Sequence, residues 1–386
     1  MMGEKDPQLT IFYNLSLETF VPPEHPLRRI RPLVDDEAIR RHCRPLYSDK
    51  GRPSIPPEQL FLALLAGYLM GITSERKLVM ELQCNMALRW FVGLNLDQKA
   101  WDHSTFCQNR RRRFDKDGTM QWLLEQTVER AIDAELVSRH VSADGTLVRA
   151  NASYKSFAPI ELTMDPDEYR RKLGSEDRPG VNDEPEDPGN RAVDFRGEKR
   201  SNKTHRSTTD PDCRFVSKGA TGTGAFPGYT VNAVMENRNR IILGIGEEIY
   251  RSSQGEEQGC LSILKRIKRR FRFQPESLGA DKGYFHEEFL EELLARGIEP
   301  HVAAKTTGSS KAHARVRMRE RGEGYQLSQR CRKKIEELWG EAKDWHGLRR
   351  LRRRGRERVR EELGQIGWVL NLKRLARLLM PSLQAA

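Results

Sequence analysis

The order of strand-like and helix-like segments after residue 138 constrains the fold more than any other feature of this sequence. Short apolar and alternating runs predict strands over residues 139–149, 213–216, 229–236, 240–249, 277–280 and 298–304. Helical periodicity predicts helices over residues 255–273, 287–295 and 329–343. Residues 237–239 are expected to join two of the strands as a hairpin. This part of the chain is therefore expected to form an α/β or α+β unit built on a mixed sheet.

Two of the predicted strands carry an aspartate in or just after their apolar run. Asp144 lies within VSADGTLV (residues 141–148), and Asp281 follows LGA in LGADKGYF (residues 278–285). Three antiparallel strands followed by alternating helices and strands are the element order of an RNase H-like mixed sheet. In that sheet the first and fourth strands lie side by side, which would bring Asp144 and Asp281 together.

The predicted helix over residues 329–343 (QRCRKKIEELWGEAK) adds a third carboxylate. Arg332, Glu336 and Lys343 are four and seven positions apart, so at about 100° per residue they fall within roughly 40° of one face. An apolar stripe lies beside them, formed by Leu327, Cys331, Ile335, Leu338, Ala342 and Trp345. The helix is therefore expected to bury that stripe and to hold Glu336 between two cations at its edge.

Two strand aspartates and a helix glutamate suit two-metal phosphoryl transfer. Mg²⁺, or Mn²⁺ in its place, prefers hard oxygen ligands, and water and substrate phosphate complete its coordination. We therefore predict that Asp144, Asp281 and Glu336 are catalytic and bind two such ions, and that Arg332 and Lys343 either hold phosphates or screen the charge of Glu336. Thr146, Lys282 and Tyr284 are weaker predictions for residues that line the site. Taken singly, each carboxylate is more readily interpreted as an ordinary surface or capping residue, but the three together, each in its expected local context, favour the metal site.

Residues 1–137 are expected to form an all-helical N-terminal domain. A breaker cluster at residues 51–57 precedes helices that are separated by short turns. The last of them carries four consecutive arginines, Arg110, Arg111, Arg112 and Arg113. This order favours a DNA-binding unit of helix-turn-helix type, with a packing or dimerisation domain as the alternative. A helix over residues 118–137 is expected to lead into the catalytic domain at residues 138–386.

The net charge of +12 is unevenly distributed. Residues 311–360 contain 18 Lys and Arg against 7 Asp and Glu. A basic stretch of this kind favours a polyanionic partner such as nucleic acid, although a solvated charged helix gives the same pattern. Within it, Arg349 and Arg350 are predicted to contact DNA. Residues 158–194, by contrast, are rich in Pro, Gly, Asp and Glu and are expected to form a flexible acidic insertion.

The sequence offers no sign of a membrane or secretory protein. The six cysteines are scattered, with no metal-binding spacing, which disfavours a zinc site and a disulfide framework. No apolar run approaches the length of a membrane span, and the first ten residues do not resemble a signal peptide. We therefore expect a cytoplasmic protein that is associated with the nucleoid when it acts.

Four stretches resemble the DDE transposases of bacterial insertion sequences: residues 139–157, 196–212, 279–284 and 330–355. The match is best with the IS5-like group of the IS4/IS5 class. That class carries a Tyr-Arg-Glu-Lys signature, to which Arg332, Glu336 and Lys343 correspond, whereas Gln329 stands at the tyrosine position. The N-terminal part, from GRPSIPPEQL to DHSTFCQNRRRR, is similar to the helical domain that accompanies these enzymes.

The resemblance implies a transposase that binds the terminal inverted repeats of its own element. It would cleave DNA at each end with Mg²⁺ and then transfer the strand to target DNA. Handling two ends together implies a homodimer or a larger assembly on double-stranded DNA. Two alternatives remain open: a non-catalytic DNA-binding repressor derived from a transposase, and an RNase H-like structure-selective nuclease that cuts DNA but joins nothing.

Overall fold

A computed structural model describes residues 16–51, 54–72, 74–114, 117–160, 193–217, 224–248 and 255–380. The chain divides into two compact units. The first comprises Met1–Asn109 together with Leu379–Ala386, and the second is Arg110–Leu378. This division falls before the helix Thr119–Asp133, which therefore belongs to the second unit, whereas the sequence placed the boundary at residue 137.

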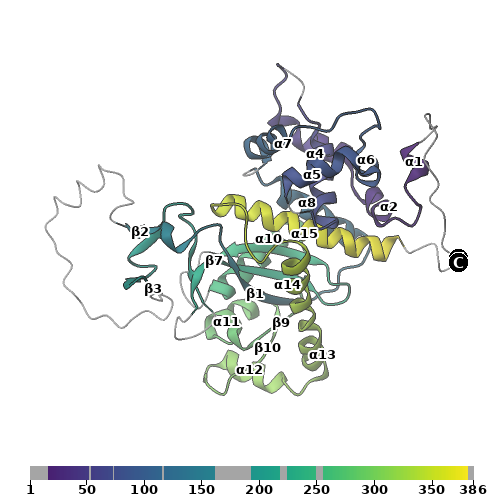
Figure 1. The fold of residues 1–386 in the computed structure, drawn as a ribbon. Helices are drawn as coiled ribbons and strands as arrows, with labels where there is room; N and C mark the ends of the chain where they lie inside the picture. Colours follow the sequence, from purple (N-terminus) through teal and green to yellow (C-terminus); the bar gives the residue numbers. More distant parts are fainter. Residues whose placement is uncertain are drawn as a thin grey trace, which may run out of the picture. The chain divides into compact units, whose positions relative to one another are not determined.

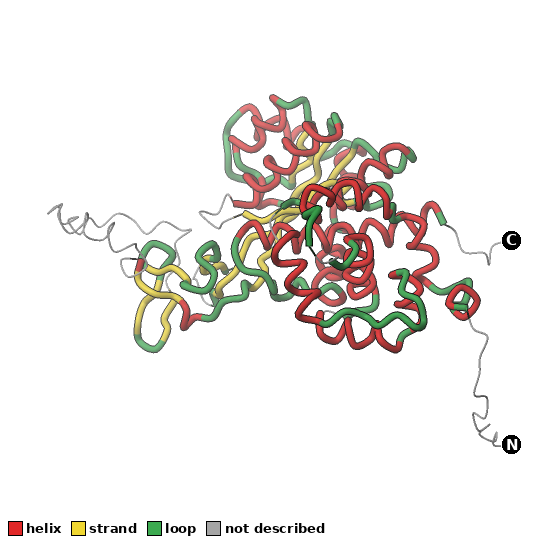
Figure 2. Tube along the Cα trace, turned by 90° about the horizontal axis from the view of Figure 1, so that it is seen from above, coloured by secondary structure: helices red, strands yellow, loops and turns green. Residues whose placement is uncertain are grey.

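The described residues of the first unit form helices and no strands (Figure 2). In chain order they are α1 (Leu17–Phe20), α2 (Pro26–Ile30), α3 (Asp36–Cys43), α4 (Pro57–Leu69), α5 (Glu75–Cys84), α6 (Met86–Val92) and α7 (His103–Asn109). Asp35, Ser74 and Asn85 cap the starts of α3, α5 and α6. The central helix is α4, which is buried along nearly its whole length and packs against α3, α5 and α6.

The second unit is built on a six-stranded mixed sheet in the order β10-β9-β1-β7-β6, with β8 also paired to β7 (Figure 1). The strands are β1 (His140–Arg149), β6 (Arg214–Val216), β7 (Phe226–Glu236), β8 (Ile242–Glu248), β9 (Ser277–Ala280) and β10 (Glu299–Val302). β1 is antiparallel to β7 and parallel to β9, and β9 is parallel to β10. The predicted neighbourhood of the first strand and the strand that precedes Asp281 is therefore confirmed.

Helices cover both faces of this sheet. They are α8 (Thr119–Asp133), α10 (Gly255–Phe271), α11 (Glu287–Ala295), α12 (Lys311–Arg319), α13 (Glu323–Arg332), α14 (Lys334–Trp345) and α15 (Arg356–Leu379). Successive strand residues point to opposite faces. On β1, Asp144 is bonded from α14, whereas a Cβ on Gly145 would meet the Glu256 carboxyl group of α10 at 2.7 Å. Thus α14 and α10 lie on opposite faces of the sheet.

One buried side chain ties α15 to the edge strand β8. The Asn371 amide accepts a hydrogen bond from Ile242 N and donates to Ile242 O, and it also donates to Thr127 Oγ1 on α8. Asn371 is fully buried, so satisfying its polar atoms in this way removes the cost of burying them. The bonds fix α8 and α15 against the same end of the sheet.

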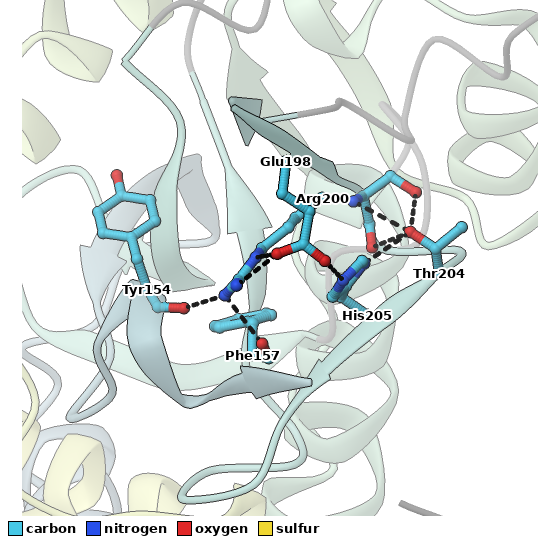
Figure 3. Close-up of polar contacts among 7 residues, drawn as sticks. Tyr154, Phe157, Glu198, Arg200, Thr204 and His205 are labelled. Atoms are coloured by element: carbon cyan, nitrogen blue, oxygen red, sulfur yellow. Dashed lines mark hydrogen bonds and ion pairs between the residues drawn. The ribbon is translucent and has the colours of Figure 1, made fainter. Parts of the chain in front are cut away.

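Short strands occupy the connection between β1 and β7. β2 (Phe157–Pro159) pairs with β5 (His205–Ser207), and β3 (Val193–Phe195) pairs with β4 (Glu198–Arg200). Figure 3 shows how they are tied: Glu198 bonds both Arg200 and His205, and the Arg200 guanidinium donates to the Tyr154 and Phe157 carbonyls. The side chains of Arg200 and His205 therefore form hydrogen bonds that connect these short strands.

Most of the predicted acidic insertion, residues 161–192, lies outside the described residues. In the described part of the chain, every helix is too short or too polar to cross a membrane.

The expected single helix over residues 329–343 is interrupted. α13 ends at Arg332 and α14 begins at Lys334, so Arg332 and Glu336 lie on different helices. The predicted apolar stripe is wrong at both ends, since Leu327 is 57% exposed and Trp345 is 69% exposed. Within α14 the stripe holds at Ile335, Leu338 and Ala342, which are buried, and it fails at Trp345, the last residue of that helix.

Candidate active site

The sheet register places Asp144 and Asp281 at the same level of neighbouring strands. Ser142 of β1 pairs with Gly279 of β9, and each aspartate follows its paired residue by two positions. Adjacent strands lie about 4.8 Å apart, so the two aspartates are neighbours where β9 ends. The structure thus brings together two of the three predicted catalytic carboxylates.

Local backbone geometry fixes Asp281 just beyond its strand. The residue has an extended backbone and precedes a short 3₁₀ turn, Lys282–Tyr284. Its Oδ1 accepts a hydrogen bond from Gly283 N at 2.8 Å. The Lys282 side chain beside it is exposed. Asp281 therefore caps its own turn and sits at the rim of the sheet.

The pKa of the Asp144 carboxyl group is shifted by burial and by neighbouring charges. Burial raises the pKa of its carboxyl group to about 6, and the nearby charge of Asp281 adds to this effect. Hydrogen bonds from Trp339 and Gly145 and the charge of Arg332 act in the opposite direction on the pKa. Two carboxylates that repel each other in a partly buried place are stabilised by a shared hard cation.

Two polar contacts hold α14 on β1. Trp339 Nε1 donates to Asp144 Oδ2 at 3.0 Å, and Lys343 Nζ donates to Thr146 Oγ1 at 2.6 Å. Asp144 and Thr146 share one face of the strand, while Trp339 and Lys343 are one helical turn apart. Thr146, one of the weaker predictions for a residue that lines the site, is buried and contacts α14 instead of being exposed at the surface.

Glu336 lies one turn before Trp339 on the same helix, but its side chain is 65% exposed. Its Oε1 is 3.8 Å from Arg332 Nη1. Among the described residues, no three His, Cys, Asp or Glu side chains are gathered closely enough to hold a metal ion. The aspartate pair therefore suits a divalent cation by its donor chemistry, whereas Glu336 is not gathered with it in this arrangement.

Gln329, which stands at the signature tyrosine position, has a defined structural role. Its Nε2 donates to the carbonyl of Ala280 at 3.2 Å and also to that of His301. Its Oε1 accepts from Arg332 Nε at 3.3 Å. The side chain therefore links the ends of β9 and β10 to the residue that pairs with Glu336. Ala280 immediately precedes Asp281, so Gln329 anchors α13 beside the site.

Sequence reasoning missed the contacts of Gln329 and Trp339. For Trp339 a signal existed in the spacing, because it lies three residues after Glu336 and four before Lys343 and so shares their side of the helix. The sequence placed Gln329 at the signature position but gave no partner for it. Tyr284, predicted weakly as a lining residue, is fully buried, and burial raises the pKa of its hydroxyl group.

A basic loop follows α14 and runs beside the end of β1. Leu351 N donates to Arg149 O at 2.8 Å, and Asn151 Nδ2 donates to Arg352 O at 2.7 Å. The side chains of Arg149, Arg349, Arg350, Arg352 and Arg354 are exposed. Because β1 carries Asp144, the strand that holds the carboxylate ends against an arginine-rich surface.

The four consecutive arginines do not behave alike. They form a short π-helical turn, Arg110–Phe114, that follows α7. Arg110 is buried at 9% exposure, whereas Arg111 and Arg112 are exposed and Arg113 is intermediate. A π-helical turn advances each residue by less than an α-helix does, so the positions predicted from α-helical spacing change. The predicted DNA contact is thus better suited to Arg111 and Arg112 than to Arg110.

Comparison with known proteins gives two matches to domain families. A transposase domain (DUF772) matches residues 15–112, and a transposase DDE domain matches residues 193–372. The second match includes Asp281 and Glu336 but begins after Asp144. Together the two cover more than two thirds of the chain. No curated protein and no solved structure matches. Two transposase domains in the order of this chain place it among the DDE transposases of insertion sequences.

Proposed function

We propose that this protein binds the terminal inverted repeats of its insertion sequence, cleaves a DNA strand at each end and joins the freed ends to target DNA. In the first step water attacks the end phosphodiester and releases a 3′-OH. In the second step that 3′-OH attacks a target phosphodiester and displaces a target 3′-oxygen, so bonds are exchanged without an outside energy source. The observation that supports the proposal is that Asp144 and Asp281 lie at the same level of neighbouring strands in a mixed sheet of order β10-β9-β1-β7, which is compatible with the expected RNase H-like arrangement.

The chain's own residues would divide the work between metal binding and phosphate binding. Asp144, Asp281 and Glu336 would hold divalent cations, Mg²⁺ or Mn²⁺, which neutralise charge at the reacting phosphate. Glu336 is exposed and is not gathered with the aspartate pair, so a change in its side-chain conformation or in the α13–α14 turn would be needed for it to join them. Arg332 and Lys343 would hold DNA phosphates beside the carboxylates, with Lys343 also donating to Thr146 Oγ1.

DNA would be bound over a wider surface than the carboxylate site. The exposed arginines after α14, including Arg349 and Arg350, lie at the end of β1, where they would contact the phosphate backbone. Arg111 and Arg112 would add contacts near the N-terminal helical unit. Because two element ends must be handled together, we expect a dimer or a larger assembly on DNA, acting in the cytoplasm at the nucleoid.

The Glu336→Gln variant tests the third carboxylate. It keeps the size of the side chain and removes the charge, so we expect cleavage of an end duplex in Mg²⁺ to fall by at least about a thousandfold, as for loss of a group that acts in the transition state. Binding to the same duplex should be nearly unchanged. Cleavage is measured on a labelled duplex and binding by fluorescence anisotropy.

Glu337→Gln is the matched control for that experiment. Glu337 is the adjacent residue, is exposed and pairs with Arg240 rather than facing the site. The Glu337→Gln variant should cleave the end duplex like the wild type. Normal cleavage by Glu336→Gln would remove Glu336 from the mechanism, and equal losses in both variants would indicate a general defect of α14.

A further inference from the structure

Trp339 makes a hydrogen bond from α14 to Asp144, one of the proposed metal-binding carboxylates. Its indole Nε1 donates to Asp144 Oδ2 at 3.0 Å, and the side chain is only 5% exposed. An indole nitrogen can only donate, and an ionised carboxylate can only accept, so the direction of this bond is fixed. A buried indole N–H also costs free energy unless it is paired.

The surroundings of the bond restrict how Asp144 can turn. The Gly145 backbone N–H also bonds the Asp144 carboxylate. Four residues along α14, the Lys343–Thr146 bond gives the helix a second contact with the same strand. With one carboxylate oxygen occupied by the indole, the orientation of the group about its terminal torsion is set by the protein.

The neutrality of the donor matters as much as its position. A lysine or arginine at this position would offset the negative charge of the carboxylate and would repel an incoming divalent cation. An indole has no net charge, so it can orient the carboxylate and leave its negative charge available. Partners that orient metal ligands in this way commonly contribute about tenfold to hundredfold in metal affinity.

We propose that Trp339 is a positioning residue that holds Asp144 Oδ2 and so directs the other carboxylate oxygen toward the divalent cation shared with Asp281. The proposal rests on the proposed function, because it takes Asp144 and Asp281 as metal ligands. It adds a requirement of its own: the indole N–H, and not only the bulk of the ring, must contribute to metal binding.

The test compares Trp339→Phe with Trp345→Phe. Phenylalanine fills most of the buried space without a donor, whereas Trp345 lies on the same helix, is 69% exposed and serves as the control. Mn²⁺ binding to the full chain is measured by calorimetry in the absence of DNA. We expect Trp339→Phe to weaken Mn²⁺ binding by about tenfold, Trp345→Phe to bind like the wild type, and Asp144→Asn to lose that binding.

The outcomes separate this proposal from the proposed function. Equal Mn²⁺ affinity in Trp339→Phe and wild type, with binding lost in Asp144→Asn, would overturn the role of Trp339 and leave the metal site standing. Absence of Mn²⁺ binding by the wild type would overturn both. In end cleavage, the Mn²⁺ concentration for half-maximal rate should rise about tenfold in Trp339→Phe, with a smaller change in the maximal rate.

A second measurement does not depend on how well Trp339→Phe folds. Mn²⁺ is paramagnetic and quenches a nearby indole, so titrating the wild type should quench part of its tryptophan fluorescence over the range in which calorimetry reports binding. Trp345→Phe should show the same quenching and Asp144→Asn should not. Binding without any quenching would place the cation away from Trp339 and contradict the proposal.

Discussion

Replacing Asp144 with asparagine is expected to abolish cleavage of the element's ends. The substitution keeps the shape of the side chain and an oxygen that can accept the Trp339 bond, but removes the charge that balances a divalent cation. We expect the cleavage rate in Mg²⁺ to fall by at least about a thousandfold, since electrostatic stabilisation of the transition state depends on the position of that charge. The rate is measured by single-turnover cleavage of a labelled end duplex.

The sequence supplies a matched control for this variant. Asp117-Gly-Thr119 repeats the tripeptide that begins with Asp144, yet Asp117 lies just before α8, where its Oδ1 accepts a hydrogen bond from Thr119 N at 3.2 Å. Asparagine keeps the side-chain oxygen that accepts this bond, so Asp117→Asn should fold and cleave nearly like the wild type. Cleavage that survives in Asp144→Asn, or is lost equally in Asp117→Asn, would show that Asp144 is not a catalytic group.

The same carboxylate is expected to make the metal-free protein less stable at neutral pH. The pKa of Asp144 is raised in the folded protein from its ordinary value of 3.8 to about 6. Between these values the folded state holds a proton that the unfolded chain has released. The unfolding free energy therefore falls as pH rises through this window, and the whole loss is present above pH 6. At about 1.4 kcal/mol per pKa unit, the loss is at most about 3 kcal/mol.

Asp144→Asn removes this titration, so without metal at pH 7 it should be more stable than the wild type by up to about 3 kcal/mol. The difference should shrink below pH 4, where the wild-type carboxyl group is protonated. Mg²⁺ at a hundred times its dissociation constant should stabilise the wild type by about 2.7 kcal/mol and leave the variant unchanged. Denaturant unfolding with and without EDTA measures both effects. A less stable variant at pH 7 would contradict the assigned environment of Asp144.

The aspartate pair could be predicted from sequence because it depends on local pattern and strand order. Alternation around Asp144 and the apolar run before Asp281 each identify a strand, and element order then makes the two strands neighbours. Both signals are local in the sequence. The parallel pairing of β1 with β9 then follows from the order of the strands and helices, and not from any single side-chain contact. The bounds of β9 and α11 agree with the predicted ranges at every residue.

The surroundings of the pair could not be predicted in the same way. Periodicity treats residues 329–343 as one helix, and it does not detect the turn at Lys333 that separates Arg332 from Glu336. The bonds of Gln329 to strand-end carbonyls and of Trp339 to Asp144 depend on how α13 and α14 are placed over the sheet. Tertiary packing sets that placement, and a helical wheel carries no information about it.

The central claim is that the protein both cleaves DNA ends and joins them, and one measurement tests it most directly. Purified protein is incubated with Mg²⁺, a donor plasmid that carries the element's two ends and a second plasmid as target, beside Asp144→Asn. We expect nicked ends and donor–target joined molecules with the wild type and neither product with the variant. Cleaved ends without joined molecules would indicate a nuclease. End binding with no cleavage by the wild type would contradict the catalytic assignment and favour a DNA-binding repressor.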